Sequence, residues 1–409
     1  MTALVVAIFA LTYLGMALGR LPGLRIDRAG IAVVAAAALL AAGAVGERQA
    51  LAAIDGRTLV VLFALMIVSA QFAAAGSYEV CARRLVATAR RPTVLLAGVV
   101  VVAGGLSAVL ANDVVVFAMT LVLCSGLARQ GRDPRPFLVA LAAASNAGSA
   151  ATVIGNPQNI LIGQAGYLDF LAFLQACAPP AVAALLVVFI VVRLVWRRHF
   201  GSAATDPVRP NPAPPPAHDR WQMAKGVAAV AAVIAVFVSP VDAPLGALSV
   251  AALLLLSRRL ASRDMLGAVD WHLLLLFAGL FVVTGAMSAT GLTAAALDLL
   301  RHEVGDPTAL RVLGPMLLAL SNTVGNVPAV ILLLQLLPDL EPAALYRIAV
   351  LSTLAGNFLL VGSLANLIVA ERAAQAGVRL GFGDFARAGV PIALVSMGLA
   401  AGWFALLQP

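Results

Sequence analysis

The chain has 409 residues, of which 62% are hydrophobic and 11% are charged, and its mean hydropathy is +1.00. This composition excludes a soluble globular protein and indicates an all-α polytopic membrane protein. The net charge of +8 does not indicate a nucleic-acid-binding protein, because the basic residues are distributed as in a membrane protein (see below).

Apolar stretches of spanning length recur along the chain. The first lacks a basic segment in front of it and leads directly into further spans, which predicts an uncleaved helix rather than a signal peptide. About ten crossings are expected, near residues 2–19, 29–46, 58–75, 137–162, 176–196, 222–238, 244–257, 271–290, 344–370 and 388–407. Between the fifth and the sixth, the Pro-rich polar residues 197–220 predict a linker that cannot pack.

Two other apolar stretches are predicted to be re-entrant hairpins. Residues 312–338 are too short for two crossings, which need about 40 residues, and acidic residues flank both ends. Residues 92–128 have basic ends, with Asn112 and Asp113 in the interior. Each hairpin should therefore enter and leave the membrane on one face.

The charged residues separate onto two sides of the predicted membrane. The loops on one side hold 22 of the 27 Lys and Arg and 9 acids, and those on the other hold 5 basic residues and 9 acids. The first side should be cytoplasmic, with the linker, and both termini should lie outside. Of the 19 acids, Asp113 is the one left within the membrane.

The two halves of the chain resemble each other. "IDGRTLVVLFALMIVSAQFAAAG" matches "VDWHLLLLFAGLFVVTGAMSATG", and "GNPQNILI" matches "GSLANLIV". The matched positions are Asp55 with Asp270, Asn112 with Asn326, Gly155 with Gly362, and Asn159 with Asn366. Each half has five crossings and one hairpin, an odd number of passes. Residues 1–196 and 221–409 are therefore expected to form two inverted repeats, as in secondary transporters.

Two of the predicted crossings contain residues that interrupt a helix. Gly155-Asn156-Pro157 and Gly362-Ser363 should end one half-helix and begin the next, giving broken helices over 137–162 and 344–370. The N–H groups at the start of each second half-helix favour an anion. Asn159 and Asn366 could instead hold helices together.

Asp113 is the most informative single residue. A carboxylate within a bilayer costs about 2.5–3.5 kcal/mol and usually lines an ion or proton pathway. The alternative is a neutral, hydrogen-bonded acid at the hairpin tip. Val327 stands at the matching position, so any coupling through Asp113 would be asymmetric.

At these residues the chain resembles the ion transporter superfamily of citrate transporters, arsenite permeases and divalent-anion:sodium symporters. "GSAATVIGNPQNILIG" is similar to the first-half signature, "GNFLLVGSLANLIV" to its second-half partner, and "LSAVLANDVVVFAMT" to the arsenite permease hairpin. The resemblance implies an elevator mechanism and a possible homodimer in membrane lipids. Dicarboxylate symporters carry Ser-Asn-Thr at both hairpin tips. This chain has Ala111-Asn112-Asp113 and Gly325-Asn326-Val327 there, which weakens sodium-coupled dicarboxylate uptake; Ser321-Asn322-Thr323 lies four residues before the aligned position.

We therefore expect a proton-coupled secondary transporter of a small anion, a carboxylate or an inorganic oxyanion, in the inner membrane. No cofactor and no metal are expected, and sodium is the alternative coupling ion. The predicted binding residues are Asn112, Asp113, Thr152, Gly155, Asn156, Pro157, Asn159, Gly325, Asn326, Gly362, Ser363 and Asn366.

The sequence also allows four other functions to be compared with this one. A sodium/proton antiporter and an arsenite efflux permease of the same superfamily remain open, and inverted repeats make a channel less favoured. The string Gly381-Phe382-Gly383-Asp384 also fits intramembrane aspartyl proteases, with Asp113 as its partner. However, its repeat mate Asp169 lies on the opposite side of the membrane, where a catalytic residue has no use.

Overall fold

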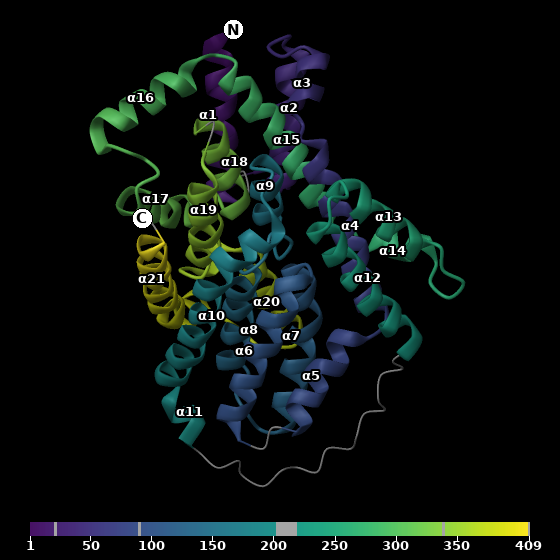
Figure 1. Cartoon of the computed structure of the whole chain (residues 1–409). Helices are drawn as coiled ribbons and strands as arrows, with labels where there is room; N and C mark the ends of the chain where they lie inside the picture. The colour runs from purple at the N-terminus through teal and green to yellow at the C-terminus, as the bar shows by residue number, and fades with distance from the viewer. Residues whose placement is uncertain (20–22, 89–90, 202–218, 338–339, 408–409) are drawn as a thin grey trace.

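The computed structural model describes residues 1–19, 23–88, 91–201, 219–337 and 340–407, and these contain helices and no strand. Figure 1 shows the course of the chain. Most of the predicted linker, residues 197–220, lies outside the described residues, which resume at Asp219. The division into residues 1–196, 197–220 and 221–409 stays a prediction.

The helices follow the same order twice. The first series is α1 (Thr2–Leu18), α2 (Arg28–Ala41), α3 (Glu47–Ala53), α4 (Gly56–Ala74), α5 (Ser77–Thr88), α6 (Pro92–Val109), α7 (Asn112–Arg129), α8 (Arg135–Ser149), α9 (Pro157–Ala165) and α10 (Phe170–Val195), followed by the short α11 (Arg197–Gly201). The second series is α12 (Arg220–Val238), α13 (Ala243–Leu255), α14 (Ser262–Gly267), α15 (Trp271–Ser288), α16 (Leu292–Val304), α17 (Leu310–Thr323), α18 (Asn326–Leu336), α19 (Pro342–Ala355), the 3-10 turn η1 (Leu360–Gly362), α20 (Leu364–Gln375) and α21 (Phe382–Leu406).

Aspartates begin matching helices in the two series. Asp27 caps α2 and Asp242 caps α13, and likewise Asp55 caps α4 and Asp270 caps α15. In each case the carboxylate accepts the backbone N–H three residues further on. A carboxylate at this position satisfies an N–H that the helix leaves free and favours the positive end of the helix dipole. The repeat seen in the sequence thus sets where these helices start.

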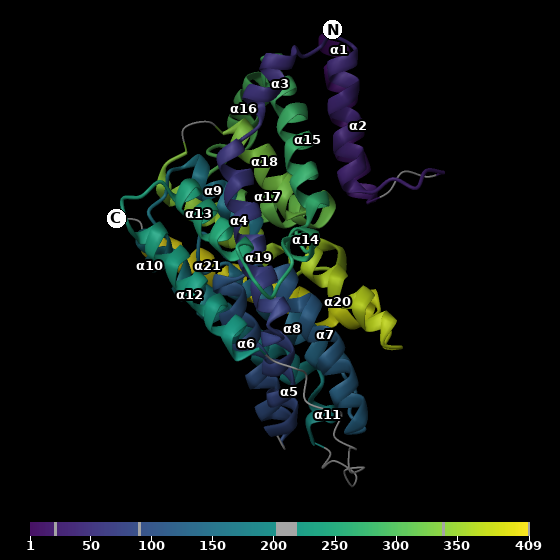
Figure 2. The same cartoon turned by 90° about the vertical axis from the view of Figure 1, so that its right-hand side faces the viewer.

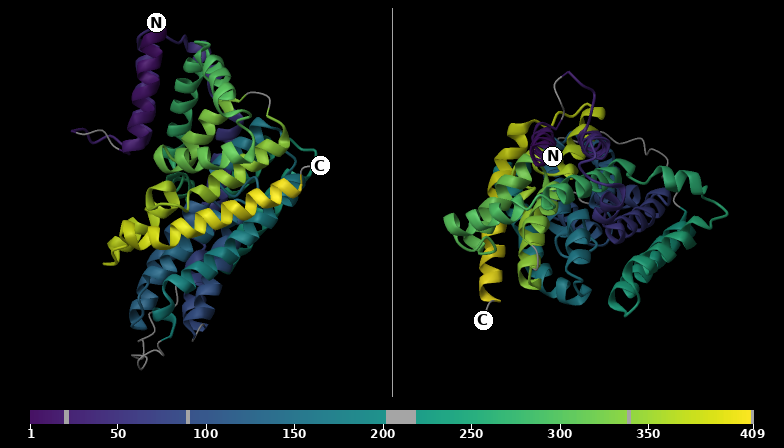
Figure 3. Two further views of the ribbon diagram at one scale, coloured as in Figure 1. Left: turned by 90° about the vertical axis from the view of Figure 1, so that its left-hand side faces the viewer. Right: turned by 90° about the horizontal axis from the view of Figure 1, so that it is seen from above.

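The two series run in opposite directions and interlock. Helix α4 descends from α3 to α5, whereas α15 ascends from α14 to α16 (Figures 1 and 2). Helix α2 packs against α15 of the other series, and α13 packs against α4 in the same way. The long helices α10 and α21 lie side by side (Figure 3, left). This arrangement is the inverted repeat expected from the sequence.

The helices also sort into two packing groups. The first group contains α1–α4 and α12–α15, and the second contains α6–α10 and α17–α21. Helix α5 connects α4 with the hairpin α6–α7, and α16 connects α15 with the hairpin α17–α18. These two connecting helices lie at opposite ends of the molecule (Figure 1).

The described residues contain 7 helices that are individually long and apolar enough to cross a membrane. Two of them, α6 and α7, are the arms of the first hairpin, with 18 residues each. Other expected crossings are shorter helices, such as α2 with 14 residues, or are divided into the half-helices α8–α9 and α19–α20. The number of long helices therefore differs from the number of crossings because a broken helix passes through the protein in two pieces.

Candidate functional site

The tips of both hairpins lie inside the protein. The first hairpin turns at Leu110 and Ala111, and the backbone N–H of Ala111 donates to Ser69 Oγ at 3.0 Å. Asn112 begins the second arm, with 5% of its surface exposed. In the second hairpin Asn326 occupies the equivalent place and is also buried. The residue before it, Gly325, has φ +99°, a conformation that favours glycine. The sequence match between the two asparagines is thus a structural match.

Each broken helix restarts after a polar residue, Asn156 in the first series and Ser363 in the second. Helix α8 ends at Ser149, and α9 begins at Pro157, which needs no intrahelical partner for its nitrogen. The side chain of Asn156 caps α9 by accepting the N–H of Asn159 at 2.8 Å. In the second series Ser363 precedes α20, although its hydroxyl makes no cap hydrogen bond.

Two asparagines bridge the breaks, and we call Asn159 and Asn366 the bridging asparagines. Asn159 Nδ2 donates to the carbonyls of Ser149 at 3.1 Å and Thr152 at 2.9 Å. Asn366 Nδ2 donates to the carbonyls of Gly356 at 2.8 Å and Leu359 at 3.1 Å. The offsets, ten and seven residues back, are identical in both series. Both pairs of carbonyls lie at or just after the end of a half-helix, where the helix supplies no donor to those of Ser149 and Gly356. The carbonyls of Thr152 and Leu359 also accept the backbone N–H of Gly155 and Gly362.

The two breaks also contact each other reciprocally. Asn156 Nδ2 donates to Thr353 Oγ1 at 3.2 Å, and Ser363 Oγ donates to Asn146 Oδ1 at 3.0 Å. Asn156 is the repeat mate of Ser363, and Asn146 is the repeat mate of Thr353. These bonds therefore obey the approximate two-fold symmetry of the repeats.

Glycine is required at both breaks by close packing. A Cβ on Gly155 would lie 2.2 Å from the carbonyl oxygen of Ser149, and one on Gly362 would lie 2.4 Å from Asn322 Oδ1. Asn322 itself donates to the carbonyl of Ala355 at 2.9 Å. Asn322, from the Ser321-Asn322-Thr323 string, thus fixes the second hairpin against the second break.

A cavity of about 520 Å³ opens where the tips and breaks meet. It lies between the two helix groups, bounded by the end of α1, the starts of α2 and α15, and α20. The predicted residues that line it are Asn112, Asp113, Pro157, Gly325, Asn326, Gly362 and Ser363. A smaller adjoining cavity shares Asn112, Asp113, Pro157 and Asp270 and adds Asn156.

Four predicted residues do not line the central cavity or the smaller one: Thr152, Gly155, Asn159 and Asn366. Thr152 Oγ1 donates to the carbonyl of Ala108. The Nδ2 groups of both bridging asparagines are occupied by backbone carbonyls, because the helix breaks free those carbonyls close by. In this structure both bridging asparagines therefore hold the breaks, and the expected role of Asn159 and Asn366 as direct amide contacts stays a prediction.

The charges on the cavity wall are mixed. The acids are Asp27, Asp113, Asp270 and Glu371, and the bases are Arg28 and His272. Asp113 is half-buried in the first turn of α7, beside the hairpin tip. Asp270 comes from the other helix group and faces the same two cavities. A proton or a cation between them would relieve the repulsion of two ionised carboxylates.

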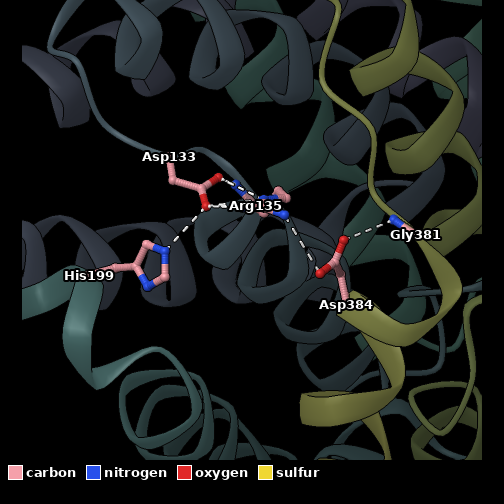
Figure 4. Close-up of polar contacts among 5 residues, drawn as sticks. All are labelled: Asp133, Arg135, His199, Gly381 and Asp384. Atoms are coloured by element: carbon pink, nitrogen blue, oxygen red, sulfur yellow. Dashed lines mark hydrogen bonds and ion pairs between the residues drawn. The ribbon is translucent and has the colours of Figure 1, made fainter.

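A separate polar cluster contains Asp384, the acid of the protease-like string (Figure 4). Its carboxylate accepts the N–H of Gly381 at 3.2 Å and lies 3.7 Å from Arg135. Arg135 forms a 2.8 Å ion pair with Asp133, which also lies 3.5 Å from His199. Burial acts to raise the pKa of Asp133, but hydrogen bonds and charge from Arg135 outweigh it and hold the pKa below 3.8. Asp384 thus links the start of α21 to the start of α8 through Arg135, and it does not share a site with Asp113.

Comparison with known proteins assigns the family. A sequence profile described as the citrate transporter family matches residues 6–349. The chain belongs to this family. An uncharacterised transporter of Mycobacterium tuberculosis is 29% identical, with 92% of this chain and 93% of the relative covered. The silicon efflux transporter LSI3 of Oryza sativa is 27% identical (87% and 87%), and the inner membrane protein YbiR of Escherichia coli is 33% identical (79% and 81%).

The fold of this citrate transporter family member has a solved counterpart. The YdaH transporter of Alcanivorax borkumensis superposes with a TM-score of 0.57 at 14% identity, covering 100% of this chain and 99% of the other. At that identity the likeness concerns the fold alone. The family match and the apolar helices together make the chain a multi-pass membrane transporter.

Sequence reasoning missed several wall residues of this family member. Arg28 and Asp270 were assigned to loops, although both begin helices that border the cavity. The match of Asp270 with Asp55 marked it as a repeated position but not as a cavity residue. Asn146 and Gln158 also line the cavity. Gln158 lies in the quoted break motif, which was the available signal for it.

Proposed function

We propose that the protein is a secondary active transporter that moves a small anion, coupled to protons through Asp113. The observation that carries this proposal is the meeting of both hairpin tips and both breaks at one cavity, with Asp113 on its wall. Amides from Asn112 and Asn326 and the hydroxyl of Ser363 offer polar contacts there. Such a wall suits a small polar solute, and a half-buried carboxylate beside it can carry a proton.

An elevator mechanism agrees with the two packing groups. The tips and breaks belong entirely to the second group, and the cavity lies at its boundary with the first. Helices α5 and α16 join the groups at opposite ends, where each could act as an arm when one group slides. Movement of the second group past the first would expose the cavity alternately on the two sides.

The family description and the cavity wall support a proposal for the substrate class. The family is described as a citrate transporter family, and one relative is a silicon efflux transporter. We propose a carboxylate or an inorganic oxyanion for this chain. We also propose an inner-membrane location with both termini outside and the linker cytoplasmic, and a homodimer, which cysteine labelling and mass photometry would test.

A second candidate is a sodium/proton antiporter or an arsenite efflux permease. The observation that favours an antiporter is the excess of acids on the cavity wall, four against Arg28 and His272. In that case Asp113 and Asp270 would hold the cation and the proton in turn. A requirement for an anion separates this candidate from the first.

The test is the transport current of proteoliposomes on a solid-supported membrane. Wild type, Asp113→Asn and the control Asp264→Asn, an exposed acid outside both cavities, receive citrate, succinate, sulfate, phosphate, arsenite or sodium, each with and without a pH step. The proposal expects an anion-dependent current whose pH dependence is lost in Asp113→Asn alone. A sodium-driven current without an anion would overturn it in favour of the antiporter, and unchanged pH dependence in Asp113→Asn would remove the proton role.

A further inference from the structure

Among the described residues that line the central cavity, Arg28 is the one arginine. It begins α2 and is half-buried, directly after the capping residue Asp27. In the second series Ala243 follows the equivalent cap Asp242, so the first series alone supplies this charge. The guanidinium thus makes the two sides of the transport pathway chemically different.

The guanidinium has donors that face the cavity. Its Nε donates to the carbonyl of Met16 at 3.1 Å, which anchors the side chain against the end of α1. One terminal nitrogen, Nη1, lies 3.4 Å from the position that a Cβ on Gly325 would occupy. Arg28 therefore sits beside the second hairpin tip, where a planar fork of N–H groups can bind the oxygens of an anion.

Asn112 contributes the opposite hydrogen-bonding character at the first tip. Its Nδ2 is directed at Asn146 Oδ1 at 3.5 Å, and Asn146 Oδ1 also accepts from Ser363. Because that oxygen is an acceptor, the amide of Asn112 is held with Nδ2 toward it. Asn112 Oδ1 is buried and has no partner in the protein. A buried acceptor without a donor is costly unless a ligand supplies one.

We propose that Arg28 and Asn112 select an oxyanion that keeps a hydroxyl group. The anionic oxygens bind the Arg28 guanidinium, and the hydroxyl donates to Asn112 Oδ1. Partly protonated inorganic oxyanions and hydroxycarboxylates meet both requirements, whereas a fully deprotonated oxyanion leaves Asn112 Oδ1 unpaired. This inference rests on the proposed function, because it specifies the substrate of the same cavity.

The experiment measures ligand affinity by the thermal stabilisation of the purified full-length protein at neutral pH. Two matched pairs of probes are used: phosphate, which keeps a proton, against sulfate, which keeps none, and citrate against tricarballylate, which lacks only the hydroxyl. The variants are Arg28→Gln, Arg28→Lys and Asn112→Leu. Arg25→Gln is the control, since Arg25 is exposed and lies outside the cavity lining. The unliganded melting temperature of each variant shows whether it folds.

Arg28→Gln is expected to weaken the binding of phosphate or citrate about tenfold to a hundredfold, as for the loss of a hydrogen bond to a charged group. Arg28→Lys should recover part of this loss and Arg25→Gln should show none. In wild type, phosphate should bind better than sulfate, and citrate better than tricarballylate, and Asn112→Leu should remove the preference.

Equal binding by Arg28→Gln and wild type would overturn the proposal, and so would equal binding of the two members of both pairs. Either result could coexist with an anion-dependent, pH-coupled current, in which case the proposed function stands and this inference alone fails. If no anion stabilises the protein or drives a current, the proposed function fails as well.

Discussion

Replacing a bridging asparagine tests whether the breaks are held from within the protein. In Asn366→Leu the side chain keeps a similar size but loses both N–H donors, so the carbonyls of Gly356 and Leu359 lose the bonds at 2.8 and 3.1 Å. The same change removes the acceptor for Asn146 Nδ2 at 3.1 Å. Asn159→Leu removes the equivalent pair of bonds in the first series.

The expected cost follows from what replaces the lost bonds. If each side-chain hydrogen bond contributed the average found in a membrane protein, about 0.6 kcal/mol, two bonds would be worth only about 1.2 kcal/mol. Here Gly356 is buried and Asn366 is fully covered, so water cannot reach the freed carbonyl of Gly356, whereas the carbonyl of Leu359 still accepts the N–H of Gly362 at 3.0 Å. An unsatisfied buried acceptor costs about 1–3 kcal/mol. We therefore expect Asn366→Leu to lower the free energy of unfolding by about 2–4 kcal/mol.

The assay is reversible unfolding in mixed micelles with an increasing fraction of denaturing detergent, followed by helical circular dichroism. Asn366→Asp separates the two donors from the acceptor, because it keeps Oδ1 while removing Nδ2. A cost below about 0.5 kcal/mol for Asn366→Leu would refute the bridging role and restore a role in direct substrate contact. Asn366→Leu should cost somewhat more than Asn159→Leu, because it also removes the acceptor of Asn146 Nδ2, whereas Asn159 Oδ1 accepts no hydrogen bond from the residues that the structure describes.

Two further predictions concern other parts of the chain. Asp133→Asn should destabilise the protein by about 1 kcal/mol at neutral pH. Because the pKa of Asp133 is lowered in the folded state, this advantage of the wild type exists above pH 3.8 and disappears as the pH falls further. Melting temperatures of both proteins from pH 7 to pH 3 would show this loss. A variant that costs the same at both ends of that range would contradict the ion pair with Arg135. Gly155→Ala should cost more than about 2 kcal/mol because its Cβ meets the Ser149 carbonyl at 2.2 Å, whereas Gly398→Ala, with no atom within 4 Å, should be neutral in the same unfolding assay.

Much of the architecture could be predicted because its signals are local. The hairpins and the broken helices follow from the length of apolar stretches and from residues such as Pro157 that interrupt a helix. The pairing of Asn112 with Asn326, and of Gly155 with Gly362, follows from similarity between two stretches of one chain. The inverted orientation then follows from an odd number of passes.

The use of each site residue could not be predicted in this way. Asn159 and Asn366 are polar residues beside a break, and that pattern is the same whether the amide meets a substrate or a carbonyl. Gly362 illustrates the same limit, because its neighbour Asn322 belongs to α17 of the second hairpin, about 40 residues earlier in the chain. Only the distances between atoms distinguish these roles.

By itself, then, the sequence determined the class of the protein, the repeat and the breaks, and it singled out Asp113, because hydropathy, charge and helix-breaking residues act over short stretches of chain. The tertiary structure alone decided which side chains face the cavity. It brought Arg28 and Asp270 from helices of the first packing group to the cavity beside the hairpin tips of the second group. It also left the bridging asparagines outside the cavity lining. These contacts join residues far apart in the chain, and they depend on how the two groups pack rather than on any neighbouring residue.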